Sequence, residues 1–234
     1  MNFITSLMMK QRTVAWELNK ENILNCFTEE SKANLLDLGC DDGVWTKKIA
    51  EKIKTDKISG IELIEERAQK AREIGIKVEI ADLNSEFPYK NDMFDVIHTN
   101  QVIEHVKDTD LFVSEIHRIL KPGGYAVVST ENLASWHNIG ATILGYMPFS
   151  LVNVSNKTAS VGNPLAPHNN EEFWESDTWQ HVRVFTTKGL KHLFELFGFK
   201  VENIYGAGYY PLGNFFSKLD PWHSAFITFK IKKI

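Results

Sequence analysis

Residues 35–43 read LLDLGCDDG, and this stretch decides the fold. Its leucines form a short apolar run that is typical of a buried parallel strand, with Asp37 near the carboxyl end. Gly39 and Gly43 bracket a tight turn, and a helix-like stretch, VWTKKIAEKIK, begins at once. Glycine lets the backbone approach a ligand closely, and a helix N-terminus offers unpaired N–H groups. The order of strand, glycine turn and helix therefore predicts a ligand-binding loop.

Hydrophobic periodicity and turn residues predict the other elements along the chain. Further strands are expected at 58–62, 77–83, 94–100, 125–130, 200–206 and 224–233. Helices are expected within 1–30 and at 44–54, 64–74, 108–120 and 186–199, and the LKPGG sequence is expected to end the fourth of them. The apolar stretch 138–151 predicts one or two short helices.

Two acidic residues follow predicted strands. Glu62 ends the strand at 58–62, roughly 20 residues beyond the glycine turn, where nucleotide-binding α/β sheets place an acid that accepts the two ribose hydroxyls. Asp82 comes just beyond the next strand, and it is either a second ligand contact or a simple turn cap.

These motifs resemble those of class I S-adenosylmethionine-dependent methyltransferases, over residues 34–130. The family's first motif is acidic-x-Gly-x-Gly-x-Gly, and Asp41 stands here for the middle glycine, a residue that tolerates left-handed backbone well. The series FDVIHTNQVIEHV and LKPGG matches later motifs in the right order. The resemblance implies an α/β fold: a Rossmann-like, seven-stranded, mostly parallel sheet with a terminal antiparallel hairpin, flanked by helices, with a lid insertion after the fifth strand.

The resemblance also implies S-adenosyl-L-methionine as the cofactor. In such proteins an acid at the position of Asp82 takes the adenine amino group, and the next residue, Leu83, packs on the ring. The residues expected to bind the cofactor are Asp37, Gly39, Cys40, Asp41, Gly43, Glu62, Leu63, Asp82, Leu83, Asn100 and Gln101.

Residues 131–185 form an unusually long connection, which is typical of a lid or a binding element. It is rich in aromatic rings and histidines, among them Trp136, His137, Tyr146, Phe149, His168, Phe173, Trp174, Trp179 and His181. We expect Trp136, His137 and Arg183 to bind the acceptor, with Arg183 suited to an acidic group. The alternative is a dimer or packing element with no substrate contact.

Transfer to a hydroxyl requires a base, and histidine is the usual candidate. His105 and His181 are the predicted catalytic residues, although a structural role for each remains an alternative. Gln101, Glu104 and His105 would share one face if the segment were helical, and a similar cluster binds a divalent metal in some related methyltransferases. Those proteins have a carboxylate where this chain has Gln101, so no metal is expected.

The chain is expected to be a single methyltransferase domain over 1–234, divided into a helical cover (1–30), a cofactor-binding core (34–130), the insertion (131–185) and a closing helix with a strand hairpin (186–234). From the helical cover, Arg12 and Trp16 either reach the cofactor or serve only packing.

Composition narrows the class of protein. The 234 residues carry a formal net charge of −4, which argues against general nucleic-acid binding. Two cysteines with no C-x-x-C indicate neither a disulfide framework nor a zinc-cysteine site. We read no signal peptide and no apolar run long enough to span a bilayer, so a cytoplasmic enzyme without membrane insertion is expected.

The function expected from the sequence is methyl transfer to a small molecule or a glycan intermediate, at oxygen. The first alternative is a non-catalytic cofactor-binding protein whose insertion serves a partner. The second is a nicotinamide-dependent oxidoreductase, which would need G-x-G-x-x-G where the chain has GCDDG.

Overall fold

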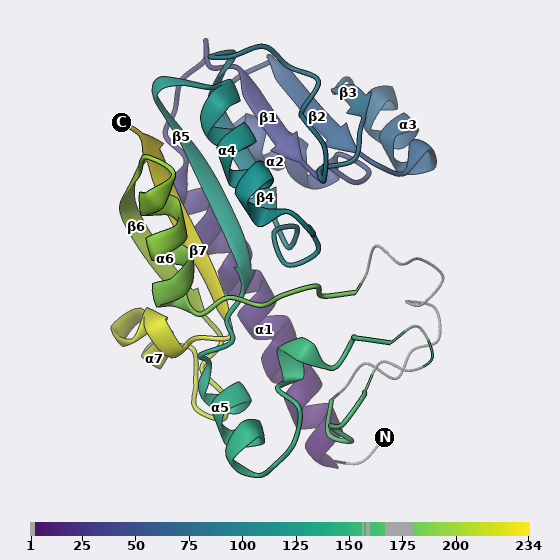
Figure 1. The fold of residues 1–234 in the computed structure, drawn as a ribbon, viewed down its shortest axis with the longest axis vertical. Coiled ribbons are helices and arrows are strands. Elements are labelled where there is room, and N and C mark those ends of the chain that lie inside the picture. The colour runs from purple at the N-terminus through teal and green to yellow at the C-terminus, as the bar shows by residue number, and fades with distance from the viewer. Residues whose placement is uncertain (1–2, 156, 158–159, 167–179) are drawn as a thin grey trace. The chain divides into compact units, whose positions relative to one another are not determined.

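The computed structural model describes residues 3–155, 157, 160–166 and 180–234 (Figure 1). The chain divides into two compact units. Unit 1 consists of Met1–Asn22, Thr130–Leu190 and Tyr205–Thr228, and unit 2 consists of Ile23–Ser129, Lys191–Ile204 and Phe229–Ile234. Four residues named above for the insertion lie outside the described residues: His168, Phe173, Trp174 and Trp179.

A seven-stranded sheet has the strand order β3-β2-β1-β4-β5-β7-β6. Its strands are β1 (Leu35–Leu38), β2 (Ile58–Glu62), β3 (Lys77–Ile80), β4 (Phe94–Asn100), β5 (Leu120–Glu131), β6 (Phe199–Ala207) and β7 (Phe226–Lys233). The pairs from β3 to β5 are parallel. At the two ends of the β6–β7 pair, Ala225 N–H donates to Gly208 O and Ile234 N–H donates to Gly198 O, which is an antiparallel pattern. The predicted mostly parallel sheet with a terminal antiparallel hairpin is confirmed.

Three helices of unit 2 connect its parallel strands: α2 (Val44–Ile53), α3 (Glu65–Glu73) and α4 (Thr109–Ile119). The apolar stripe expected on α4 is buried, because Phe112, Ile116 and Ile119 have no exposed surface. The leucines of β1 are likewise fully buried, as expected of a central parallel strand covered on both faces. The apolar run of β1 therefore correctly indicates a strand in the interior of the sheet.

Helix caps of the expected kinds fix the element boundaries. Asp108 accepts a hydrogen bond from Leu111 N–H (2.9 Å) and caps α4. Thr186 Oγ1 accepts from Gly189 N–H (3.1 Å) at the start of α6 (Thr187–Leu196), and Gly198 follows α6 with φ +81°. The Thr cap and glycine stop predicted for this helix are confirmed.

Several predicted boundaries are wrong. The fifth strand begins at Leu120 and not at residue 125, because Leu120 pairs with Phe94 before an irregularity restores the register at Val96 and Tyr125. The third strand ends at Ile80, so Asp82 lies in a turn. The first helix, α1 (Phe3–Cys26), ends before residue 30.

In unit 1, the insertion forms α5 (Trp136–Ile143) and the 3₁₀ turn η1 (Phe149–Leu151), which confirms the expected short helices. The later segment adds α7 (Phe215–Leu219) and η4 (Pro221–His223). Asn132 joins the two segments, since its Nδ2 donates to the carbonyls of Trp222 and Ser224. A small apolar core lies beside them, in which the rings of Trp16 and Phe226 meet edge to face at 5.5 Å. Among the described residues, none of the helices has the length and apolar character that crossing a membrane demands.

Candidate functional site

The glycine loop of unit 2 lies between β1 and α2, and its backbone is left-handed at three positions. Gly39 has φ +75° and Gly43 has φ +78°. Asp41, which stands for the motif's middle glycine, has φ +49°. An added Cβ at Gly43 would lie 2.5 Å from Ile76 Cδ1 and 2.9 Å from Ala71 Cβ. Glycine is therefore required there for packing as well as for conformation.

Asp37 is the last residue but one of β1 and is 2% exposed. Its Oδ1 lies 2.7 Å from Nδ1 of His98 on β4, and its Oδ2 accepts the hydroxyl of Thr46 in the first turn of α2. The predicted cofactor residue thus connects three elements around the loop. His98 was not predicted, and its Nε2 has no partner among the described residues.

Cys40 and Glu62 lie at the base of the loop. Burial, with the nearby carboxyls of Asp37 and Glu62, raises the pKa of the Cys40 thiol, so Cys40 stays protonated and is not a nucleophile. Glu62 Oε2 accepts from Asp41 N–H (3.0 Å), and its Oε1 accepts from the N–H groups of Leu63 (2.9 Å) and Ile64 (3.0 Å). Glu62 is thereby held rigidly at the carboxyl end of β2.

Two apolar side chains follow the acids at the ends of β2 and β3. Leu63 is 47% exposed and Leu83 is half-buried. Asp82 accepts from the backbone N–H (2.9 Å) and the side-chain Nδ2 (2.8 Å) of Asn84, both through Oδ1. The turn-cap role left open for Asp82 is present, and only one of its two oxygens is used for it.

Asn100 ends β4, and Gln101 follows it. Gln101 has φ +56°, and its N–H donates to Ser129 O (2.8 Å) on β5. Asn100 Oδ1 and Gln101 Nε2 are buried without partners among the described residues. Buried polar atoms without partners are rare in native proteins and mark places where a ligand can complete the hydrogen bonds.

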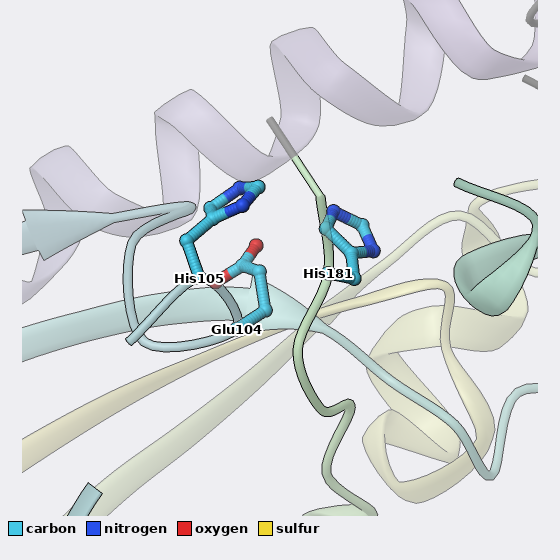
Figure 2. Close-up of side chains that lie close together, drawn as sticks. All are labelled: Glu104, His105 and His181. Carbon is cyan, nitrogen blue, oxygen red and sulfur yellow. The ribbon is translucent and has the colours of Figure 1, made fainter. Parts of the chain in front are cut away.

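Figure 2 shows Glu104 and His105, which follow one another in the loop after β4; it also draws His181, which belongs to unit 1. The loop is a turn in which His105 N–H donates to Val102 O (2.9 Å). It is not a helix, because Gln101 is left-handed and a right-handed helix cannot pass through it. The helical face considered for Gln101, Glu104 and His105 therefore does not form. Glu104 is buried and His105 is half-buried.

Unit 1 contains a cavity of about 590 Å³, within the range of small-molecule sites. Trp136 and His137 both line it, whereas Arg183 is exposed and does not. Aromatic and aliphatic side chains make most of the wall, including Leu144, Tyr146, Phe149, Leu165, Tyr210 and Phe226. Arg12 and Glu131 also line the cavity and bring one charge of each sign.

His137 lies against two aromatic rings of this cavity. Its ring centroid is 5.4 Å from that of Phe149 and 5.1 Å from that of Tyr210. Burial lowers the pKa of His137 to about 4, although Glu131 acts in the opposite direction. The imidazole is therefore neutral at pH 7.

Trp136 is held by a hydrogen-bonded ring of side chains. Its Nε1 donates to Tyr209 Oη (2.6 Å), and that hydroxyl donates to Asp220 Oδ2 (2.7 Å). His223 Nδ1 lies 2.8 Å from Asp220 Oδ2, and the His223 ring stacks on Trp136 at 4.6 Å. The indole is thereby fixed at the cavity wall. Tyr209, Asp220 and His223 were not predicted, because no local pattern signals partners more than 70 residues away.

His181, the other predicted base, belongs to unit 1. Its Nδ1 donates to the carbonyl of Ser150 (2.7 Å), which fixes the tautomer of a neutral ring and leaves Nε2 as the basic nitrogen. Tyr210, which also lines the cavity, was missed by the sequence analysis, because it lies 73 residues beyond His137 in a segment without a motif.

Comparison with known proteins gives a consistent result. A family model described as a methyltransferase domain matches residues 9–204. A ubiquinone biosynthesis O-methyltransferase of Rickettsia canadensis (strain McKiel) is 30% identical over 142 residues, which is 58% of this chain and 60% of that protein. The chain therefore matches under two thirds of the length of this relative.

Solved structures share the fold. An S-adenosylmethionine-dependent methyltransferase from Mesorhizobium loti superposes with a TM-score of 0.61 at 18% identity, covering 91% of this chain and 96% of that one. The [4+2]-cyclase SpnF superposes with a TM-score of 0.60 at 16% identity, covering 92% of this chain and 80% of that one. At these identities the likeness establishes the fold alone.

Proposed function

The chain belongs to the methyltransferase domain family, and we propose that it transfers a methyl group from S-adenosyl-L-methionine to an oxygen atom of a small molecule bound by unit 1. The cofactor and the reaction class follow from the family. The acceptor, the atom that is methylated and the residues that act are the proposal.

One observation carries the assignment of the cofactor site to unit 2. Glu62 is fixed by three backbone N–H groups at the end of β2, beside the glycine loop and the exposed Leu63. Of the roughly four lone-pair sites of a carboxylate, these bonds use three, so Oε2 retains capacity for a ribose hydroxyl. Leu63 and Leu83 offer apolar surface for the adenine ring, with the unused oxygen of Asp82 available for its amino group.

The unpartnered atoms Asn100 Oδ1 and Gln101 Nε2 support the same site, because they offer one acceptor and one donor at the end of the next strand. Asp37 contributes in a different way: its oxygens already hold His98 and Thr46, so it shapes the loop that receives the cofactor. The residues present thus fit the cofactor.

A sulfonium methyl is already electrophilic when the cofactor is bound, so the chain's own residues must orient the acceptor, exclude water and remove a proton. We propose His105 and His181 as candidate bases. For His181, the hydrogen bond from Nδ1 to Ser150 keeps the lone pair on Nε2. No step in this proposal needs a metal ion.

The mostly apolar cavity of unit 1 favours a small molecule over a glycan intermediate, whose many hydroxyls would need more polar partners than the described wall offers. Oxygen as the target is supported by the name of the Rickettsia relative, an O-methyltransferase. The expectation that the insertion acts as a lid remains part of this proposal.

The competing hypothesis is a non-catalytic cofactor-binding protein of methyltransferase fold. The test is mass spectrometry of a panel of hydroxylated small molecules incubated with the protein and S-adenosylmethionine carrying a trideuterated methyl group. We expect a labelled methyl ether with some acceptors, and its loss in His105→Gln or His181→Gln. Tight cofactor binding with no labelled product across the panel would favour the non-catalytic alternative.

A further inference from the structure

Two buried polar atoms in the unit 1 cavity have no partner among the described residues: His137 Nδ1 and Tyr210 Oη. Several other polar side chains of the wall have partners. Gln11 Nε2 donates to Pro211 O (3.2 Å), and Asn163 bonds Met147 O and Leu165 N–H. Among the buried side-chain polar atoms of the described wall, only His137 Nδ1 and Tyr210 Oη therefore lack a partner.

The pair is compact and held by aromatic packing. The rings of His137 on α5 and Tyr210 after β6 meet edge to face, with centroids 5.1 Å apart and an interplanar angle of 71°. The His137 ring also packs against the ring of Phe149, with centroids 5.4 Å apart. The two rings therefore lie in direct contact in the cavity wall.

The pair is also uncharged near pH 7. Burial lowers the pKa of His137 to about 4, and burial raises the pKa of Tyr210, whereas Arg12 opposes the second shift. The Glu131 carboxyl raises both pKa values. A neutral pair of this kind can hydrogen-bond a hydroxyl or a carbonyl, but it cannot compensate the charge of a desolvated carboxylate or phosphate.

We propose that the cavity of unit 1 selects an uncharged acceptor, with an apolar ring body and one hydroxyl or carbonyl group that is bound by His137 Nδ1 and Tyr210 Oη. This inference rests on the proposed function and names its class of substrate. Aromatic walls favour a planar body, and a cavity of about 590 Å³ accommodates one or two fused rings. A charged substrate matched to Arg183, as the sequence analysis allowed, is not part of this proposal.

The test compares three probes of one shape by calorimetry on the full chain at pH 7.5: 1-naphthol, naphthalene and 1-naphthoate. We expect 1-naphthol to bind at least about fivefold more tightly than naphthalene, because it satisfies the buried pair. We expect 1-naphthoate to bind more weakly than 1-naphthol by about tenfold or more, because Arg12 and Glu131 bring opposite charges to the wall and leave no net positive charge to compensate a desolvated carboxylate.

Three variants test whether the probes bind in the cavity and whether the Tyr210 hydroxyl contributes to their affinity. Tyr210→Phe keeps the ring and should weaken 1-naphthol about five- to tenfold while leaving naphthalene unchanged. Gly140→Leu should abolish binding of all three probes, because Gly140 lines the cavity and a Cβ added there meets no atom within 4 Å, so the longer side chain fills free space without a clash at its base. Ile143→Gln is the control, since Ile143 is on the same helix but is 78% exposed.

The proposal is overturned if 1-naphthoate binds as tightly as 1-naphthol, or if Tyr210→Phe and Gly140→Leu bind 1-naphthol like the wild type. Calorimetry with S-adenosylhomocysteine on the same proteins separates this result from the proposed function. If the probes behave as expected but no panel compound is methylated, the proposed function fails and the cavity's selectivity stands. If compounds are methylated and the variants leave probe binding unchanged, only the inference fails.

Discussion

Asp37 is a buried carboxylate that connects β1 to two neighbouring elements through its two oxygens. Oδ1 faces His98 on β4, and Oδ2 accepts the hydroxyl of Thr46 on α2. A buried hydrogen bond to a charged group contributes about 1.5–3 kcal/mol, and an unpaired buried oxygen is costly. We therefore infer that Asp37 stabilises the conformation of the glycine loop.

The first prediction concerns the Thr46 hydroxyl. Thr46→Val should lower the free energy of unfolding by about 1.5–3 kcal/mol, because Asp37 Oδ2 loses a donor. Thr109→Val is the matched control: Thr109 also lies in the first turn of a helix and is buried, but its hydroxyl has no partner among the described residues. Denaturant unfolding should show almost no change for the control, and equal losses in both variants would contradict the bracing role.

The second prediction concerns the protonation of His137. Its folded pKa of about 4 lies below the ordinary value of about 6.5, so between these pH values the unfolded chain binds more protons. Stability from this residue is complete above pH 6.5 and falls as the pH drops toward 4, by about 1.4 kcal/mol for each pKa unit.

Chemical denaturation at pH 7 and pH 4.5 measures this effect. His137→Phe should reduce the difference in unfolding free energy between the two pH values by a few kcal/mol. His192→Gln, at an exposed position, should leave that difference as in the wild type. If His137→Phe keeps the wild-type difference between pH 7 and pH 4.5, another group causes the loss of stability in acid.

At the scale of elements, the glycine loop and the helix that follows it depend on close packing. Gly43 precedes α2 with φ +78°, and its Cα faces Ala71 of α3 and Ile76. The sequence predicted the turn from its glycines, and the structure adds that α3 is the reason why no side chain fits at Gly43.

The third prediction separates conformation from packing. Gly43→Ala and Gly75→Ala both place alanine at positive φ, which costs about 1 kcal/mol. Only Gly43→Ala also meets atoms at 2.5 Å and 2.9 Å, whereas nothing lies within 4 Å at Gly75. Gly43→Ala should therefore lose at least about 1 kcal/mol more in denaturant unfolding, and it should also weaken cofactor binding. Equal losses would show that the loop tolerates the methyl group.

Elements with strong local patterns could be predicted from the sequence, and the loop after β4 could not. The leucines of β1 and the apolar stripe of α4 report burial directly, because each pattern has the period of its element. The segment from Gln101 to Val106 has helical spacing, yet the positive φ of Gln101 prevents a helix. That conformation is set by the bond from Gln101 N–H to Ser129 on β5, a contact 28 residues away.

At the scale of the whole molecule, the two units have different relations to the sequence. The candidate cofactor residues of unit 2 follow one another at strand ends, so an ordered motif series was sufficient to find them. The cavity of unit 1 combines Arg12, residues 131–165 and Tyr210, which no local pattern connects. For that reason Trp136 and His137 could be predicted from the composition of the insertion, whereas Tyr210 and the hydrogen-bonding partners of Trp136 could not be predicted. The single-domain division expected over 1–234 stays a prediction.

The most direct measurement is calorimetric titration of S-adenosylhomocysteine into the wild type, Glu62→Ala and Glu66→Ala. Glu66 is the matched control, because its carboxylate lies four residues along the chain in an exposed pair with Lys70. A third variant, Leu63→Ser, changes an exposed side chain and tests the same site without disturbing the hydrogen bonds of Glu62. Thermal unfolding of each variant verifies that it is folded.

We predict that Glu62→Ala binds S-adenosylhomocysteine at least about fivefold more weakly, since the lost ribose hydrogen bonding corresponds to about 1–3 kcal/mol. Leu63→Ser should weaken binding to a smaller extent, and Glu66→Ala should bind like the wild type. Wild-type affinity in folded Glu62→Ala and Leu63→Ser proteins would contradict the assignment of the cofactor site to the strand ends of unit 2.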